Sequence, residues 1–172
     1  FRYLSAPTKS LADPYDEARL KAVVAKFGGN EVSHLGLMRD KSLHFYQVDG
    51  EDRVFFLFKK KADKLIVMGE PVGDETQIPA AIADFMKQAD DQDMSLVFYE
   101  INESLTMKLN EFCFDFMKFG EEGYVDVTTF TFAGTKRKGE RALMHKFERE
   151  GYSVELLKPP FDDALLDDLQ TV

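Results

Sequence analysis

The chain of 172 residues has no tryptophan, one cysteine and three histidines. With a single cysteine, Cys113, it can form neither an intramolecular disulfide nor a cysteine-based zinc site. Cys113 stands in the apolar run EFCFDF, which predicts a buried thiol rather than a nucleophile. The histidines (His34, His44 and His145) are scattered and lack HExxH or similar ligand spacing. We therefore expect no metal.

Long apolar runs and nucleotide motifs are also missing. No window approaches the roughly 18 apolar residues of a membrane span, and no signal peptide is recognisable. There is no Walker sequence, GxSxG elbow or dinucleotide glycine fingerprint. The chain opens with FRYLSAP, without an initiator methionine, and a helical pattern begins shortly before its last residue. We expect a piece of a longer protein, in which residues 1–172 form a single lobe.

Charge is the most informative feature that is present. The net charge is −9, yet residues 133–150 hold six Lys or Arg against three Glu. This stretch is called the basic segment below. Within it Arg137, Arg141, His145 and Arg149 recur every four residues, and Leu143, Met144 and Phe147 lie roughly opposite. The pattern predicts a helix with one face on a core and a cationic face that binds an anionic partner. An ordinary solvated face is the alternative.

Periodicity predicts a mixed α/β order. Asp13-Pro14 resembles a helix start, with Asp13 as N-cap, and Gly28-Gly29 resembles a helix end. Three strands separated by a hairpin signal at Asp49-Gly50 predict an antiparallel meander. The expected strands are 43–48, 53–59, 64–68, 94–99, 114–119, 123–130 and 153–157, and the expected helices carry Leu20 to Phe27, Ile78 to Ala89, Leu105 to Phe112, residues 134–150 and residues 162–169.

This order resembles the acyltransferase fold of the Gcn-related N-acetyltransferases (GNAT): an α+β lobe with a central, mostly antiparallel sheet flanked by helices. In that fold the loop before the second main helix normally binds the CoA pyrophosphate. Here the loop is GEPVGD at residues 69–74, with two carboxylates and a proline that lacks an N–H donor. We therefore expect no CoA cofactor. His34 and Glu70 are weak candidates for a base.

Several ordered motifs resemble the cytosolic domain of bacterial phosphatidylglycerol lysyltransferases, the multiple peptide resistance factor family. They are GEEG at 120–123, VDV at 125–127, Phe130, GTKRK at 134–138 with Arg141, the loop GEPVG at 69–73 and SHL at 33–35. Gly123 replaces the family's usual Ala, and Glu70 its usual Asp. The resemblance runs from about Asp13 to the end of the chain.

The resemblance implies a membrane protein whose cytosolic part has two tandem GNAT-like lobes. Such enzymes move lysine from lysyl-tRNA to phosphatidylglycerol at the inner membrane face, which makes the membrane less negative and confers resistance to cationic antimicrobial peptides. This chain would be the first lobe, with residues from about 159 to 172 leading to the second. The donor is an activated ester, so no CoA, nucleotide or metal is needed.

We assign site residues by matching the charges of the implied substrates to the cations of the basic segment and to the carboxylates that precede it. We assign Lys136, Arg137, Lys138 and Arg141 to phosphates of tRNA or lipid. The lysyl ammonium group would suit three carboxylates, those of Glu121, Glu122 and Asp126. The catalytic residue stays unassigned, and we expect the isolated chain to fold without turnover. Two alternatives stay open: tRNA-dependent transfer to a peptidoglycan precursor, and a non-catalytic lobe that docks tRNA or membrane.

Overall fold

A computed structural model describes residues 10–158 and 160–170. The chain divides into two compact units, Phe1–Gly120 and Glu121–Val172, and each is described by itself. Residues 159, 171 and 172, at the ends of the expected linker, lie outside the described part.

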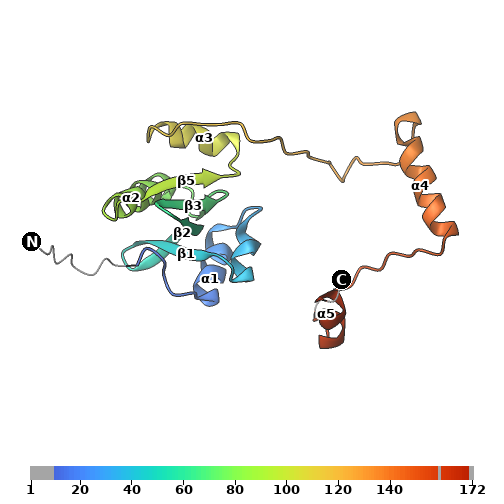
Figure 1. Ribbon diagram of the computed structural model, residues 1–172, viewed down its shortest axis with the longest axis horizontal. Helices are drawn as coiled ribbons and strands as arrows, with labels where there is room; N and C mark the ends of the chain where they lie inside the picture. Colours follow the sequence, from blue (N-terminus) through green and yellow to red (C-terminus); the bar gives the residue numbers. More distant parts are fainter. Residues whose placement is uncertain (1–9, 159, 171–172) are drawn as a thin grey trace, which may run out of the picture. The chain divides into compact units, whose positions relative to one another are not determined.

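The first unit is built on a five-stranded sheet (Figure 1). Three strands form the expected antiparallel meander, a short fourth strand pairs with the second, and the last strand lies parallel to the third. Their bounds are β1 Ser42–Val48, β2 Glu51–Lys61, β3 Lys64–Met68, β4 Val72–Gly73 and β5 Ser95–Tyr99. The predicted GNAT-like mixed α/β architecture with a mostly antiparallel sheet is confirmed.

The turn between β1 and β2 is the one that the sequence predicts. Asp49 and Gly50 both adopt positive φ, 53° and 79°. Two consecutive residues of positive φ give the backbone twist of a tight hairpin, and Asp-Gly supplies them at low steric cost. This turn fixes the register in which Phe45 pairs with Phe55.

Alternation along β2 divides the core into two apolar clusters. Phe56 and Phe58 pack with α2 (Ile78–Asp90) on one face, and Phe55 and Leu57 pack with α1 (Glu17–Phe27) on the other. Phe85 of α2 is fully buried and contacts Phe56 and Phe58. The helices of this unit are α1 Glu17–Phe27, α2 Ile78–Asp90 and α3 Glu103–Asn110, with a 3₁₀ helix at Ser33–Met38.

The start of α1 differs from the prediction. The helix begins at Glu17, and its N-cap is Asp16, whose carboxylate accepts from the N–H groups of Ala18 and Arg19. Asp13 lies before the helix, where it forms an isolated bridge with Leu43 and accepts a 2.7 Å bond from the N–H of Phe45. Asp13 therefore attaches the segment before α1 to β1, whereas Asp16 caps the helix.

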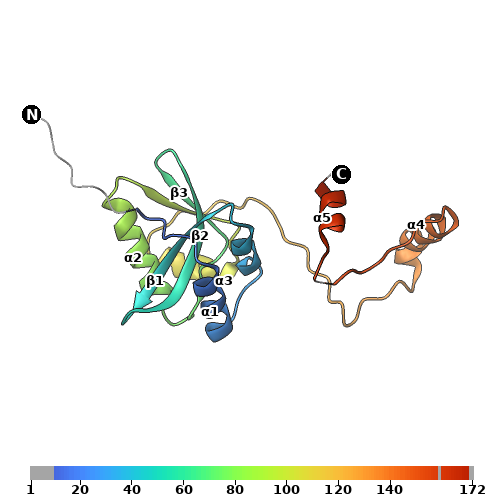
Figure 2. The same cartoon turned by 90° about the horizontal axis from the view of Figure 1, so that it is seen from below.

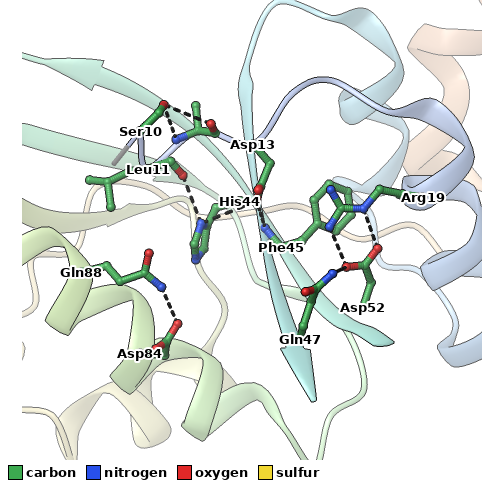
Figure 3. A network of polar contacts seen from close by, with 11 residues as sticks. Ser10, Leu11, Asp13, Arg19, His44, Phe45, Gln47, Asp52, Asp84 and Gln88 are labelled. Atoms are coloured by element: carbon green, nitrogen blue, oxygen red, sulfur yellow. Dashed lines mark hydrogen bonds and ion pairs between the residues drawn. The ribbon is translucent and has the colours of Figure 1, made fainter. Parts of the chain in front are cut away.

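Figure 3 shows the polar contacts that hold α1 and the incoming chain on the sheet. The Arg19 guanidinium donates two bonds to Asp52, at 2.7 and 2.6 Å, and lies 4.0 Å over the Phe45 ring. Gln47 donates a further bond to Asp52. Buried His44 contacts the carbonyl of Leu11 through Nδ1 at 3.0 Å. A paired charge is thus placed over an aromatic ring at the rim of the core.

The second unit has little regular structure among its described residues. It contains a 3₁₀ turn at Thr135–Arg137 followed by α4 Lys138–Arg149, and α5 Asp163–Gln170. The prediction of strands at 123–130 and 153–157 is wrong, as is that at 114–119 in the first unit: no strand forms over these residues. Alternating apolar residues become a strand only where a neighbouring strand takes up their backbone bonds.

Cys113 also corrects a prediction. It lies just after α3 with φ of 62°, and its side chain is exposed rather than buried. The helix ends at Asn110 instead of continuing through the apolar run, so Cys113 stands in the turn that follows it.

Candidate functional site

The basic segment forms the predicted helix, with a 3₁₀ turn at its start. Gly134 (φ 87°) precedes the turn, and Gly151 (φ 82°) follows α4. The four cations assigned to phosphate binding lie at this N-terminal end, two of them in the turn and two in the first turn of α4: Lys136, Arg137, Lys138 and Arg141.

The two arginines are held by their own segment. The guanidinium of Arg137 forms an ion pair with Glu140 at 2.8 Å and lies 4.9 Å over the Phe130 ring. The guanidinium of Arg141 donates to the carbonyl of Phe132 and, at 2.8 Å, to that of Gly134. Arg141 therefore ties the incoming loop to the helix, which is a positioning role.

The two lysines are more available. Lys136 and Lys138 are exposed, and neither ammonium group has an ion pair or hydrogen bond with another described residue; the backbone N–H of Lys138 donates to the carbonyl of Thr135. The Arg137–Glu140 pair is itself 40% and 45% exposed. Exposed pairs of this kind contribute little to stability, so a phosphate can compete for Arg137 at small cost. The start of the helix thus offers two free cations and one that is weakly held.

The described residues of the second unit do not cover the apolar side of α4, so the predicted packing of this side on a core is not seen within the unit. Leu143, Met144 and Phe147 are 51%, 44% and 44% exposed, and no described residue of α4 is buried. The Phe147 ring contacts Tyr152. The helix is amphipathic as predicted, but the described residues of this unit provide no apolar cluster to cover it.

The three carboxylates proposed for the lysyl ammonium group are exposed. Glu122 accepts a hydrogen bond from the Tyr124 hydroxyl. Asp126 accepts from the N–H and the hydroxyl of Thr128, at 2.9 and 2.6 Å, and from the hydroxyl of Thr129. These bonds to the charged form lower the pKa of the Asp126 carboxyl. Asp126 thus organises a local turn while remaining ionised.

A hollow of about 240 Å³ in the first unit is a feature that charge patterning does not reveal. It lies where the end of α1, the GEPVG loop and the starts of α2 and α3 meet. Its lining is Phe27, Gly28, Gly29, Asn30, Glu70, Pro71, Val72, Gly73, Glu75, Ile78, Ser104, Leu105 and Lys108. Two glycine pairs, at residues 28–29 and in GEPVG, were the available sequence signal, because glycine permits close backbone approach.

Glu70 is the half-buried carboxylate of this hollow. Its side chain accepts from the backbone N–H of Asn102 at 3.3 Å. Burial is the main cause that raises the pKa of the Glu70 carboxyl, and the Asn102 bond opposes it. His34, the other weak candidate for a base, is exposed on the 3₁₀ helix and is not part of this lining. Of the two candidates, Glu70 is the one that lines a hollow.

Among the described residues, no group of three or more His, Cys, Asp or Glu side chains is placed to hold a metal ion. No helix in this part of the chain has the length and apolarity that crossing a bilayer requires.

Comparison with known proteins gives one consistent result. The profile of the family described as "Phosphatidylglycerol lysyltransferase, C-terminal" matches residues 21–172. The phosphatidylglycerol lysyltransferase of Bacillus subtilis strain 168 is 37% identical over 165 residues, which is 96% of this chain and 19% of that protein. That of Staphylococcus aureus strain MRSA252 is 31% identical over 87% of this chain and 18% of its own length.

Solved structures agree. The structure of L-PGS from Bacillus licheniformis matches with a TM-score of 0.86 and 38% identity, over 95% of this chain and 50% of that one. The C-terminal domain of a putative lysylphosphatidylglycerol synthetase from Agrobacterium fabrum matches with a TM-score of 0.79 and 25% identity, over 90% of this chain and 48% of that one. The chain thus spans about a fifth of the curated relatives and half of the solved chains.

Proposed function

Because this chain belongs to the phosphatidylglycerol lysyltransferase family, we propose that it serves as one lobe of an enzyme that transfers lysine from lysyl-tRNA to phosphatidylglycerol. The product, lysyl-phosphatidylglycerol, carries an added positive charge and so protects a membrane from cationic peptides. The lobe acts at the cytosolic face of the membrane. The observation that carries the proposal is the cationic start of α4 within a chain of net charge −9.

The proposal assigns phosphate binding to Lys136, Lys138 and Arg137, and assigns Arg141 to holding the loop that presents them. A phosphate group gains most from donors that have no competing partner, which describes the two lysines. Arg141 already bonds two carbonyl groups, so it orders the segment rather than contacting substrate. This division refines the prediction that all four cations bind phosphate alike.

The three carboxylates keep their proposed role as contacts for the lysyl ammonium group. Asp126 stays ionised because its turn stabilises the charged form, which is the state that an ammonium group requires. The donor ester is already activated, so transfer needs a positioned alcohol and stabilisation of the developing oxyanion rather than CoA, nucleotide or metal. The reaction breaks the ester bond to tRNA and forms one to the glycerol hydroxyl, whose proton passes to the released tRNA hydroxyl.

A second lobe of the same protein is the partner we propose for this one. Its support is the apolar side of α4, which the described residues of its own unit leave about half exposed at Leu143, Met144 and Phe147. Large apolar side chains clustered on one helix face favour burial against another surface. With that lobe absent, the 172-residue chain should fold and bind tRNA but form no lysyl-lipid.

The decisive experiment is tRNA binding by K136Q/K138Q as a function of salt. Each lost phosphate contact should lower the slope of log affinity against log salt by about 1. The matched control is K21Q/K87Q, which removes the same charge from exposed ion pairs of α1 and α2. An unchanged slope in K136Q/K138Q, or an equal change in the control, contradicts the assignment.

Transfer itself is tested in the full-length parent. Lysyl-tRNA is supplied with phosphatidylglycerol vesicles or, separately, with a peptidoglycan precursor, and alanyl-tRNA replaces lysyl-tRNA in a third reaction. We expect product only from lysyl-tRNA with the lipid. Transfer to the precursor would contradict the proposed acceptor, and transfer from alanyl-tRNA would contradict the proposed donor.

A further inference from the structure

A second cationic surface lies in the first unit, at the turn between β2 and β3. Residues 59–64 read KKKADK, four lysines against one aspartate; we call them the lysine tip. Lys59, Lys60 and Lys61 are exposed, and Lys64 is half-buried. β1 begins at Ser42, opposite Phe58, so the last three residues of β2 extend beyond β1 and pair with β3 alone. Figure 2 shows this hairpin projecting from the sheet.

The register places three of the four lysines on one face of the hairpin and Lys60 on the other. Lys61 stands directly opposite Lys64, and Lys59 shares their face because side chains alternate along a strand. Like charges directly across a ladder destabilise the hairpin. Two acids offset only part of the charge: Asp63 contacts Lys64 at 2.9 Å, and Asp40 lies 3.7 Å from Lys59.

Two of the four cations have no such compensation. Lys60 and Lys61 form no ion pair with another described residue, although acidic residues outnumber basic ones in the whole chain. A fold that needed only a polar turn here would gain stability from an acid at either position. The concentration of like charge therefore indicates an anionic partner outside the unit.

We infer that the lysine tip docks on an anionic lipid bilayer. The inference rests on the proposed function, whose acceptor lipid is embedded in such a surface. Lysine is a compact, strongly hydrated charge without directional recognition, which suits a diffuse layer of headgroups. RNA-binding surfaces use arginine forks and aromatic stacking, and the tip contains neither. The start of α4, by contrast, offers arginines beside Phe130.

Docking orients the first unit relative to the membrane without inserting it. The tip exposes no large apolar side chain, so attraction is electrostatic, reversible and lost as salt shortens the screening length. Each lysine near an anionic bilayer strengthens partitioning about fivefold. The tip thus holds the first unit close to the lipid.

The test is co-sedimentation of the 172-residue chain with vesicles of mixed phosphatidylcholine and phosphatidylglycerol at low ionic strength. K59Q/K60Q/K61Q should weaken binding on the order of 100-fold, the product of three such factors. Arginine at the same three positions should retain binding, because the bilayer responds to charge. The matched control K21Q/K26Q/K87Q, with three ion-paired lysines of the same unit, should change binding less than about twofold. Vesicles of phosphatidylcholine alone should bind neither the parent chain nor any of these variants.

Three outcomes would overturn the inference. One is vesicle binding by the tip variant equal to that of the control. Another is loss of tRNA binding by the tip variant with vesicle binding intact, which would assign the tip to RNA. The third is self-association of the variant with unchanged vesicle binding. That result would indicate that the lysines prevent edge-to-edge association of an exposed strand. No step of this experiment requires lysine transfer, so a full-length enzyme that fails to form lysyl-lipid would contradict the proposed function separately.

Discussion

Replacing Gly73 by alanine should damage the hollow of the first unit through a backbone clash. Gly73 has φ of 138°, a region that residues with a Cβ rarely enter, and an added Cβ would lie 2.1 Å from the carbonyl oxygen of Arg53. That oxygen also accepts the N–H of Asp74 at 2.9 Å. The Arg53 carbonyl and the Asp74 N–H cannot shift freely, because β4 pairs with β2 at this point.

The magnitude follows from two terms. Backbone strain at such a φ costs about 1–3 kcal/mol, and forcing a methyl group into a packed site adds about 1–3 kcal/mol. We expect Gly73→Ala to lower the free energy of unfolding by about 2–6 kcal/mol, the sum of the two terms. Gly28→Ala is the matched control: Gly28 has φ of 88° and also lines the hollow, but nothing lies within 4 Å of its Cβ position. It should cost only the strain term.

Urea unfolding followed by far-UV circular dichroism measures both variants, since the chain has no tryptophan to report by fluorescence. The slope of the unfolding free energy against urea concentration should be the same in both variants, so that their unfolding midpoints can be compared directly. Equal losses in the two variants would refute the reasoning, because they would show that β4 yields to the methyl group.

Three further changes probe the core and two carboxylates. Phe85→Ala should lower the free energy of unfolding by about 3–5 kcal/mol, since it empties a fully buried site against three other rings; a loss below 1 kcal/mol in thermal melts would contradict this packing. Asp52→Asn should cost about 1–3 kcal/mol at neutral pH. Its partner Arg19 holds the pKa of Asp52 below the ordinary value, so the stability is present above the unfolded-state pKa, and the difference from the parent should shrink as pH falls below about 4. Glu70→Gln should act oppositely: burial raises the pKa of Glu70, so the variant should gain stability at neutral pH and lose that advantage in acid. A pH-independent difference in either variant's urea midpoint would contradict the assigned charge state.

Local signals predicted the sheet of the first unit well. Asp49-Gly50 fixed a hairpin because its backbone preference and the flanking apolar alternation agree. Gly28 ended α1 for a similarly local reason. The N-cap was misplaced because Asp13 and Asp16 are both good caps, and only the register with β1 decides that Asp13 bonds Phe45 instead.

Features that depend on contacts between distant parts of the chain could not be predicted from the sequence. The apolar face of α4 was visible in the helical spacing, but its exposure depends on what other residues pack there. The hollow beside Glu70 escaped too, because three elements distant in sequence line it. Charge patterning found Lys136 and Lys138 but could not separate them from Arg141, whose guanidinium is occupied by the carbonyls of Phe132 and Gly134.

The parallel pairing of β3 with β5 has a consequence for how the first unit folds. The β1–β2 and β2–β3 hairpins join neighbouring segments, whereas Lys64 meets Ser95 only after the chain has crossed the sheet through α2. Closing that larger loop costs more chain entropy before any contact compensates it. We expect the meander to form early and β5 to dock late, after Phe85 of α2 has packed against Phe56 and Phe58 of the sheet.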